Sequence, residues 1–286
     1  MRKFLNLWEN RISDWKTVFI QLAVVVFSFF FPLLFELSVT ILCCAGVYTQ
    51  PHPHHPFWDF CVGLVLARYV VHKCRQVNKN FMLNEGNRYH YHSYLGYWLA
   101  SKLLGIRKCC LIRTPIYMQY KLILNHTFPE YYTGEDSEYR YIQDEYVTFH
   151  YTGSEGSADS STINLIIEDT YSIPDSLLPE KVRQLNTVRI VRKDAVSSVR
   201  CFSPSFCKAV LSAVRNLPQS VDTINVFSTT NARHTEWIAS NVFRSVRYFH
   251  KMSLRIYPQP HTDDTWKFSS NGHTVLRVSK RNKPNR

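Results

Sequence analysis

The distribution of apolar residues divides the chain into two parts. Two long apolar runs lie within the first 75 residues, whereas apolar and polar positions are mixed in the remainder, as in a globular domain. The first run, 18–35, contains no charged residue, and it continues past Glu36 to Tyr48. A helix needs about 20 apolar residues to cross the hydrocarbon core of a bilayer. The pattern predicts a transmembrane helix over about 18–42 rather than the core helix of a globular protein.

The second run, 57–71, is shorter and contains Asp59 and Arg68, so by itself it fits either a membrane span or a core helix. Its flanks favour the span. Lysine and arginine precede the first run and follow the second, but neither occurs in the connection 49–56. Because cytoplasmic flanks are enriched in these residues, we expect a second span over about 57–72. Residues 1–75 then form a membrane hairpin, with both chain termini in the cytoplasm.

Glu36 and Arg68 are the charges expected deepest in this hairpin. Each lies about a dozen residues, or nearly 20 Å, from the outer end of its helix. A single charge at mid-membrane costs about 2.5–3.5 kcal/mol on insertion scales. We therefore predict that the two side chains are level and meet, within one subunit or between subunits. In the alternative register the first helix ends at Phe35, and Glu36 lies at the membrane surface.

Composition limits the chemistry of the chain. The formal charge of +12 suits nucleic acid, an anionic membrane surface or a small anionic ligand. Basic residues are scattered except in the tail 277–286, so we expect no DNA or RNA binding. The eight cysteines show no zinc spacing, which favours reduced thiols in the cytosol. The histidines of "PHPHHP" (51–56) are too crowded for good metal geometry, and the prolines favour a turn, so we predict no metal site.

Residues 76–286 are expected to form an open α/β sheet domain. Strands and helices alternate in its second half, with short turns between them. The polar loop 154–162 is a candidate seam between two halves, 76–155 and 160–286. The patterns predict helices at 91–104, 204–216 (with Ser203 as N-cap) and 232–250, strands at 109–112, 115–124, 162–169, 187–193, 221–229 and 252–258, β-structure within 138–153, and a hairpin at 265–278 that turns at Asn271-Gly272.

Two strand ends are candidates for a ligand site, because open α/β sheets bind ligands beyond the carboxyl ends of their strands. The second strand end also opens a helix, where free N–H groups favour an anion. The alternative is a helix cap with surface charges. The candidate ligand-binding residues are Asp169, Thr170 and Tyr171 at the first strand end, and Thr229, Thr230, Asn231, Arg233 and His234 at the second.

Enzyme signatures are missing from the sequence. It has no glycine between Gly156 and Gly272, and it contains no G-x-G-x-x-G, P-loop, H-E-x-x-H or G-x-S-x-G motif. We therefore expect a sensor domain with no catalytic residues and no cofactor.

Two segments carry a resemblance to a known family. The stretches "LIIEDTYSIPDSLLP" (165–179) and 221–258 resemble the SAVED domain of bacterial antiphage signalling systems of the CBASS type. The best-fitting residues are 224–227 and Ile256-Tyr257, but Asn225 stands where the family usually has histidine. Asn231 also stands near an expected proline. Two membrane helices followed by such a domain resemble some effectors of these systems.

The resemblance implies a fold and a function. SAVED domains look like two fused, Rossmann-like CARF halves that bind cyclic oligonucleotides, which would place Asp169, Thr170, Thr230 and Arg233 near the ligand pocket. The chain would bind a cyclic di- or trinucleotide made by a partner nucleotidyltransferase (CD-NTase). It would then form homo-oligomers and disrupt the lipid bilayer of the bacterial inner membrane.

Two other functions stay open. One is a membrane-anchored enzyme acting on nucleotide or lipid-linked substrates, for which Glu168, Asp169 and His234 are the nearby candidate catalytic groups. The other is a non-catalytic membrane anchor that carries a protein-interaction domain.

Overall fold

The computed structural model describes residues 14–44, 56–86, 88–142, 147–152, 161–192, 200–244, 252–259 and 267–277. The predicted turn before Pro56, most of the polar loop 154–162, the end of the helix predicted to reach residue 250 and most of the C-terminal tail lie outside these residues. Contacts divide the chain into two units. Unit 1 comprises Met1–Asn87, Leu95–Cys110 and Phe128–Glu130, and unit 2 comprises Arg88–Tyr94, Leu111–Thr127 and Tyr131–Arg286.

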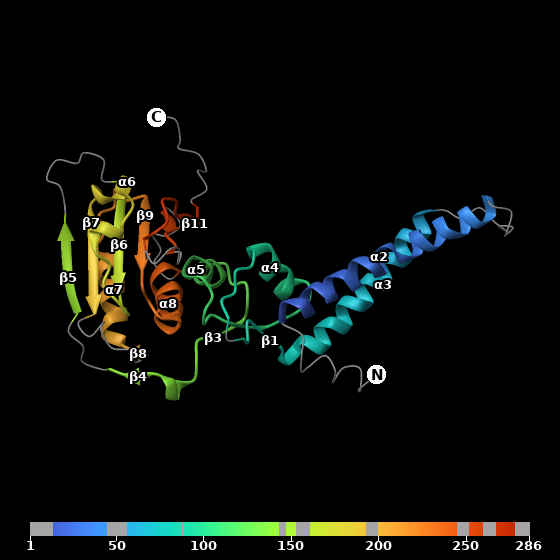
Figure 1. The fold of residues 1–286 in the computed structure, drawn as a ribbon, viewed down its shortest axis with the longest axis horizontal. Coiled ribbons are helices and arrows are strands. Elements are labelled where there is room, and N and C mark those ends of the chain that lie inside the picture. Colours follow the sequence, from blue (N-terminus) through green and yellow to red (C-terminus); the bar gives the residue numbers. More distant parts are fainter. Residues whose placement is uncertain are drawn as a thin grey trace. The chain divides into compact units, whose positions relative to one another are not determined.

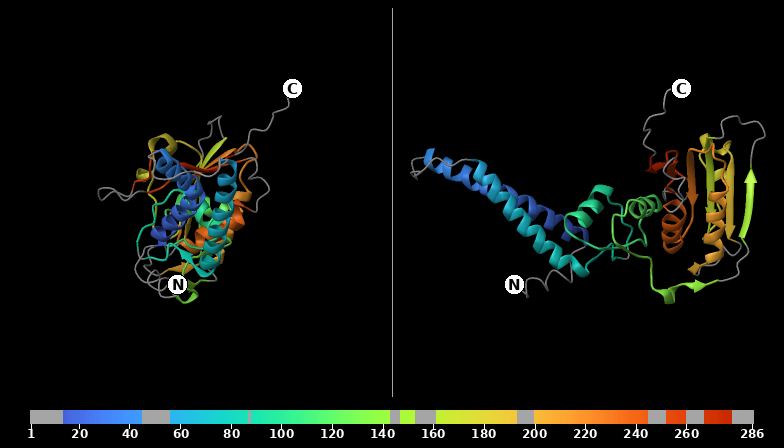
Figure 2. Two further views of the ribbon diagram at one scale, coloured as in Figure 1. Left: turned by 90° about the vertical axis from the view of Figure 1, so that its right-hand side faces the viewer. Right: turned by 180° about the vertical axis from the view of Figure 1, so that it is seen from behind.

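Unit 1 contains two long helices, α2 (Asp14–Cys44) and α3 (Pro56–Val77), which run side by side in opposite directions (Figure 2). Among the described residues, one helical stretch is long and apolar enough to cross a membrane. This stretch is Asp14–Leu37. Its most apolar window has a mean hydropathy of 2.5, and only 6% of that window is buried inside the protein. An apolar N-terminal helix is therefore present, as the first run predicts. Helix α3 carries Asp59, Arg68, Lys73 and Arg75, which keep its hydropathy lower.

Helices α2 and α3 approach closely at Gly63. A Cβ atom added there would lie 2.3 Å from the carbonyl oxygen of Phe29, and the rings of Phe29 and Phe60 meet edge-on at 5.6 Å. Because Glu36 lies seven residues to one side of this contact and Arg68 five to the other, the register separates them by roughly 18 Å along the helices, at 1.5 Å per residue. The side chains of Glu36 and Arg68 are too short to meet across this distance. The prediction that they form a level pair within one chain is therefore wrong. Their meeting between subunits stays a prediction.

The rest of unit 1 anchors the first turn of α2. Trp15 Nε1 donates to Asn84 Oδ1 at 2.9 Å, and Asn84 Nδ2 donates to the hydroxyl of Tyr97 at 2.9 Å. The rings of Trp15 and Tyr97 also pack edge-on at 5.0 Å. The short elements that follow α3 are η1 (Asn78–Asn80), β1 (Met82–Leu83), α4 (Tyr94–Lys102) and β2 (Lys108–Cys110), with β1 parallel to β2.

Unit 2 is built on a six-stranded sheet of order β11-β10-β9-β6-β7-β5 (Figure 1). Its four central strands are parallel, and the two edge strands are antiparallel to their neighbours. This arrangement confirms an α/β domain. The strands are β5 (Val147–Thr152), β6 (Thr162–Glu168), β7 (Thr187–Arg192), β9 (Thr223–Ser228), β10 (Ser253–Ile256) and β11 (His273–Leu276). The connecting elements are α5 (Ile116–Leu124), β3 (Glu130–Tyr132), η2 (Asp136–Glu138), β4 (Arg140–Tyr141), η3 (Asp175–Leu177), α6 (Glu180–Arg183), β8 (Cys201–Phe202), α7 (Pro204–Arg215), α8 (Ala232–Ile238) and the π-helical turn η4 (Ala239–Phe243).

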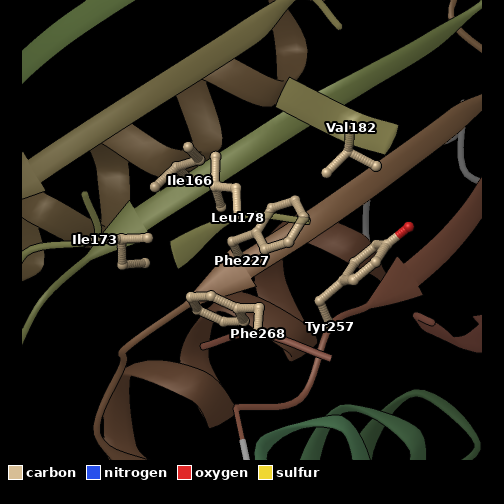
Figure 3. Packing of buried hydrophobic residues seen from close by; sticks show 7 residues of the cluster. All are labelled: Ile166, Ile173, Leu178, Val182, Phe227, Tyr257 and Phe268. Atoms are coloured by element: carbon tan, nitrogen blue, oxygen red, sulfur yellow. The ribbon is translucent and has the colours of Figure 1, made fainter. Parts of the chain in front are cut away.

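One face of the sheet packs around Phe227, whose ring stacks on Tyr257 at 4.5 Å and meets Phe268 edge-on at 5.2 Å. Figure 3 shows these rings against the aliphatic side chains of β6 and the segment after it. This cluster fixes the position of the segment that follows β10. The residues of the cluster are Ile166, Ile173, Leu178, Val182, Phe227, Tyr257 and Phe268.

Two predicted elements are wrong. The segment 115–124 forms helix α5 rather than a strand. The sequence pattern was misleading because six of the nine helical residues are buried, so the helix shows no separate apolar and polar faces. The predicted hairpin at 265–278 is also absent from its described part, since β11 pairs with β10. Gly272 serves another purpose, because a Cβ there would lie 2.7 Å from the Tyr257 ring.

The N-terminus of α7 was predicted correctly. Ser203 is fully buried, and its Oγ accepts a hydrogen bond from the amide of Phe206, while Pro204 occupies the first helical position. Losing an N-cap hydroxyl typically costs about 1 kcal/mol. Ser203→Ala should therefore lower the free energy of unfolding of unit 2 by about 1 kcal/mol, measured by urea titration of the full chain in mild detergent. Ser212→Ala, on the exposed side of the same helix, is the matched control. An equal effect of both variants would contradict the capping role.

Candidate ligand-binding site

Unit 2 contains a cavity of about 720 Å³. It lies beyond the carboxyl ends of β9 and β10, where an open α/β sheet is expected to bind its ligand. The volume falls within the range of about 300–1,000 Å³ that is common for small-molecule sites. The lining residues are Tyr89, Tyr91, Ile112, Arg113, Thr114, Pro115, Ile116, Tyr117, Gln119, Tyr139, Tyr171, Arg200, Ser228, Thr230, Asn231, Ala232, Tyr257, Pro258 and Gln259.

Six tyrosines supply most of the aromatic surface of the cavity. Tyr89 and Tyr91 are largely exposed, and their rings stack on one another at 6.1 Å. The ring of Tyr117 stacks on His273 at 4.0 Å. Burial raises the pKa of Tyr117 and Tyr171 above the usual value, so both phenols stay protonated at neutral pH. The cavity thus offers flat, uncharged ring faces and phenolic hydroxyls.

Two arginines add positive charge to this surface. Arg113 has a φ of 59°, an unusual backbone conformation for a residue other than glycine, in the turn before α5. Such outliers gather at functional sites, where the surrounding structure must hold them. Arg200 lines the cavity and forms an ion pair of 2.7 Å with Glu138, in which both side chains are about half exposed. No Asp, Glu or Lys lies among the lining residues, so the cavity suits an anion.

The structure brings three of the predicted ligand-binding residues to the cavity, namely Tyr171, Thr230 and Asn231. The hydroxyl of Tyr171 donates to Gln259 Oε1 at 2.6 Å. Asn231 caps α8, since its Oδ1 accepts from the amide of His234 at 3.0 Å. The Thr230 hydroxyl is shared with Ser228 and Thr235, at 2.7 and 2.8 Å. The side chains of Thr230 and Asn231 therefore hold the strand end and the helix start together.

Asp169 and His234 are not among the lining residues and are fully buried. One oxygen of Asp169 forms an ion pair with Arg192 Nε at 2.9 Å. The other is 2.7 Å from His234 Nδ1 and accepts from the Asn231 amide at 2.9 Å. His234 Nε2 accepts from the amide of Ser203 at 2.9 Å, so the ring proton is on Nδ1 and points at Asp169. This network joins the end of β6 to β7, α7 and α8.

The remaining predicted residues also contact other protein groups. The hydroxyl of Thr170 donates to the carbonyl of Thr229 at 2.6 Å. The hydroxyl of Thr229 donates to the carbonyl of Tyr171 at 2.9 Å. Arg233 pairs with Asp136 at 2.7 Å, and its guanidinium lies over the ring of Tyr139 at 5.1 Å. None of these three residues lines the cavity.

Sequence reasoning missed most of the lining. Arg113, Tyr117 and Gln119 lie around the start of α5, which was expected to be a strand. Tyr89 and Tyr91 alternate with the buried His90 in "RYHYHSY", so the spacing of exposed tyrosines was the available signal. Tyr139 follows no local pattern, whereas Tyr257 lies in the segment that carries the resemblance but was not assigned to the ligand site.

Comparison with solved structures finds a receptor from Acinetobacter baumannii, the Cap4 SAVED/CARF-domain containing receptor. Its complex with the cyclic trinucleotide 2'3'3'-cAAA shares 7% sequence identity with this chain at a TM-score of 0.42, over 63% of this chain. Its complex with 3'3'3'-cAAA shares 8% identity at a TM-score of 0.41, over 73% of this chain. The match covers 42% and 43% of the receptor chains, so this chain spans about two fifths of their length.

Comparison with curated proteins finds no significant match. A family model gives the assignment. The model of the SMODS- and Ubiquitin system-associated 2TM effector domain matches residues 5–276, which is nearly the whole chain. The protein therefore belongs to this family of two-transmembrane effectors.

Proposed function

We propose that the protein is a membrane-anchored receptor and effector that binds a cyclic oligonucleotide in the cavity of unit 2. Membership of an effector family with two transmembrane segments supports the effector role. The observation that carries the choice of ligand is the cavity, because it combines six tyrosines with two arginines and no carboxylate. Bases stack on aromatic rings, and arginine binds phosphate through two parallel hydrogen bonds.

The exposed pair Tyr89 and Tyr91 tests this proposal. Base stacking on an aromatic side chain contributes about 1–3 kcal/mol per base. The double variant Tyr89→Ala/Tyr91→Ala should therefore weaken cyclic oligonucleotide binding by about 30-fold or more. The measurement is titration calorimetry of the purified full chain in detergent against a panel of cyclic di- and trinucleotides.

Tyr151→Ala is the matched control, since Tyr151 is as exposed as Tyr89 but lies on the edge strand β5 and does not line the cavity. It should leave the affinity unchanged. If no member of the panel binds the wild-type chain, the proposed function is wrong. Binding that survives the double variant at full strength would place the ligand elsewhere.

The membrane part of the proposal is a hairpin in the inner membrane, with α2 and α3 as two spans and both termini in the cytoplasm. The apolar length of α2 and the 2TM family support it, and so do the basic residues that lie before α2 and at the end of α3. Alkaline phosphatase, which is active only after export, should be active when fused after residue 52 and inactive when fused after residue 80. The reverse pattern would exclude this topology.

The response we propose is oligomerisation followed by disruption of the bilayer. A ligand shifts an equilibrium only through its different affinity for the two states, so the cyclic oligonucleotide must bind the assembled form more tightly. A partner nucleotidyltransferase would supply this ligand. Leakage of a dye from vesicles that contain the full chain, triggered by the ligand, would support the response. Ligand binding without assembly or leakage would argue against it.

The proposed receptor has no catalytic step and no cofactor. The candidate catalytic groups are all buried: Glu168 pairs with Arg189, whereas Asp169 and His234 bind each other. Their burial supports a structural role for the three residues. Intact recovery of the bound cyclic oligonucleotide after long incubation with the protein is the expected result, and turnover that depends on these residues would favour the enzyme instead.

A further inference from the structure

We infer that Gln119 selects the ligand, because its side-chain oxygen requires a hydrogen-bond donor from a nucleobase that carries an amino group. The inference rests on the proposed function and adds a specificity-determining residue to the cavity. Gln119 lies on α5, lines the cavity and is 5% exposed.

The orientation of the Gln119 amide is determined by its surroundings. Its Nε2 donates to the backbone carbonyl of Thr114 at 2.7 Å. A flipped amide would place two acceptor oxygens against each other, so the nitrogen must face Thr114. The oxygen Oε1 is thereby held on the other side of the amide group.

This oxygen is buried and has no hydrogen-bond partner among the described residues. A buried polar atom without a partner is rare in native proteins, and it calls for an explanation such as a ligand. The nearby polar side chains of the cavity do not serve it. Ser228 and Thr230 bond to each other, and Asn231 caps α8.

The chemistry of an acceptor-only group defines what the ligand must present. Phosphate oxygens are acceptors, so they would be repelled from Oε1. A base with an exocyclic amino group offers an N–H donor there, whereas a base with hydrogen at the same position offers none. Sites built to bond a donor reject analogues that lack it, because the buried protein atom is left unpaired.

The test compares two ligands that differ only at this group. Cyclic oligonucleotides of adenosine and of purine riboside, which has hydrogen in place of the amino group, are matched in ring size and linkage and titrated into the full chain in detergent. The wild-type protein should bind the adenosine ring at least about tenfold more tightly. Because only the ligand is changed, this result does not depend on the folding of a variant.

Gln119→Met then removes the acceptor while keeping the length of the side chain. It should reduce the preference for adenosine over purine riboside to near one. Gln259→Met is the matched control, since Gln259 also lines the cavity but its Oε1 already accepts from Tyr171. This control should keep the preference.

The outcomes separate the inference from the proposed function. Equal binding of both rings by the wild-type chain, or an unchanged preference in Gln119→Met, overturns the role of Gln119 and leaves the receptor intact. Failure of both rings and of every other cyclic oligonucleotide to bind overturns the proposed function and this inference with it. A tenfold preference that is lost only in Gln119→Met supports the inference.

Discussion

Replacing Asp169 with alanine should lower the free energy of unfolding of unit 2 by about 3–5 kcal/mol, because it removes the carboxylate that forms an ion pair with the buried guanidinium of Arg192. Arg192 is 2% exposed, so water cannot replace the lost carboxylate. The same change removes the carboxylate oxygen that accepts hydrogen bonds from the His234 ring and from the Asn231 amide. The first turn of α8 should therefore open. Urea titration of the full chain in mild detergent, followed by near-ultraviolet circular dichroism, measures the effect.

The matched control is Asp136→Ala, which breaks the ion pair with Arg233 on the surface of the same unit. Asp136 is 90% exposed, and exposed pairs contribute about 0–1 kcal/mol. The double variant Asp169→Asn/Arg192→Met should be more stable than the sum of the two single changes, because it removes both buried charges together. Additive losses, or a stability of Asp169→Ala within 1 kcal/mol of wild type, would show that the ion pair between Asp169 and Arg192 does not stabilise unit 2.

Replacing Gly63 with alanine should loosen the packing of α2 on α3. The new methyl group would meet the backbone of Phe29, which cannot rotate away as a side chain would, so the helices must move apart. Overpacking of this kind costs about 1–3 kcal/mol. In a bilayer this packing is the main force between helices, because lipid tails are as apolar as the helix surfaces. The midpoint of unfolding by dodecyl sulfate in mixed micelles should therefore fall.

Val62→Ala is the control for Gly63→Ala. Val62 is the neighbouring residue on α3 and is about half exposed, so its truncation should leave the midpoint unchanged. An unchanged midpoint for Gly63→Ala would mean that the close approach of the two helices contributes nothing to their association.

Local patterns were sufficient for much of the fold of unit 2. The runs at 162–169 and 221–229 are apolar because both faces of a central parallel strand are buried, and they form β6 and β9. Ser203-Pro204 was recognisable as a helix start because its capping chemistry involves only neighbouring residues. The resemblance based on the segments 165–179 and 221–258, together with the membrane runs, agrees with the family to which the chain belongs.

Patterns failed where burial came from distant segments. Helix α5 has few exposed positions, so its sequence shows no apolar stripe. Gly272 was assigned to a hairpin turn, but it is required by the ring of Tyr257, fifteen residues earlier in the chain. Asp169 and His234 were correctly placed at strand and helix ends, yet the sequence could not reveal that Arg192 and Ser203 enclose them.

By itself, the sequence determined the long apolar helix, the α/β class of unit 2 and the strand ends near which the cavity lies. These features depend on the period and polarity of neighbouring residues, which can be read along the chain. Only the tertiary structure decided that Tyr89, Gln119 and Arg200 line one cavity, and that Glu36 and Arg68 are not level within one chain. The physical reason is that a cavity wall and a helix register arise from contacts between residues far apart in sequence, which no local pattern encodes.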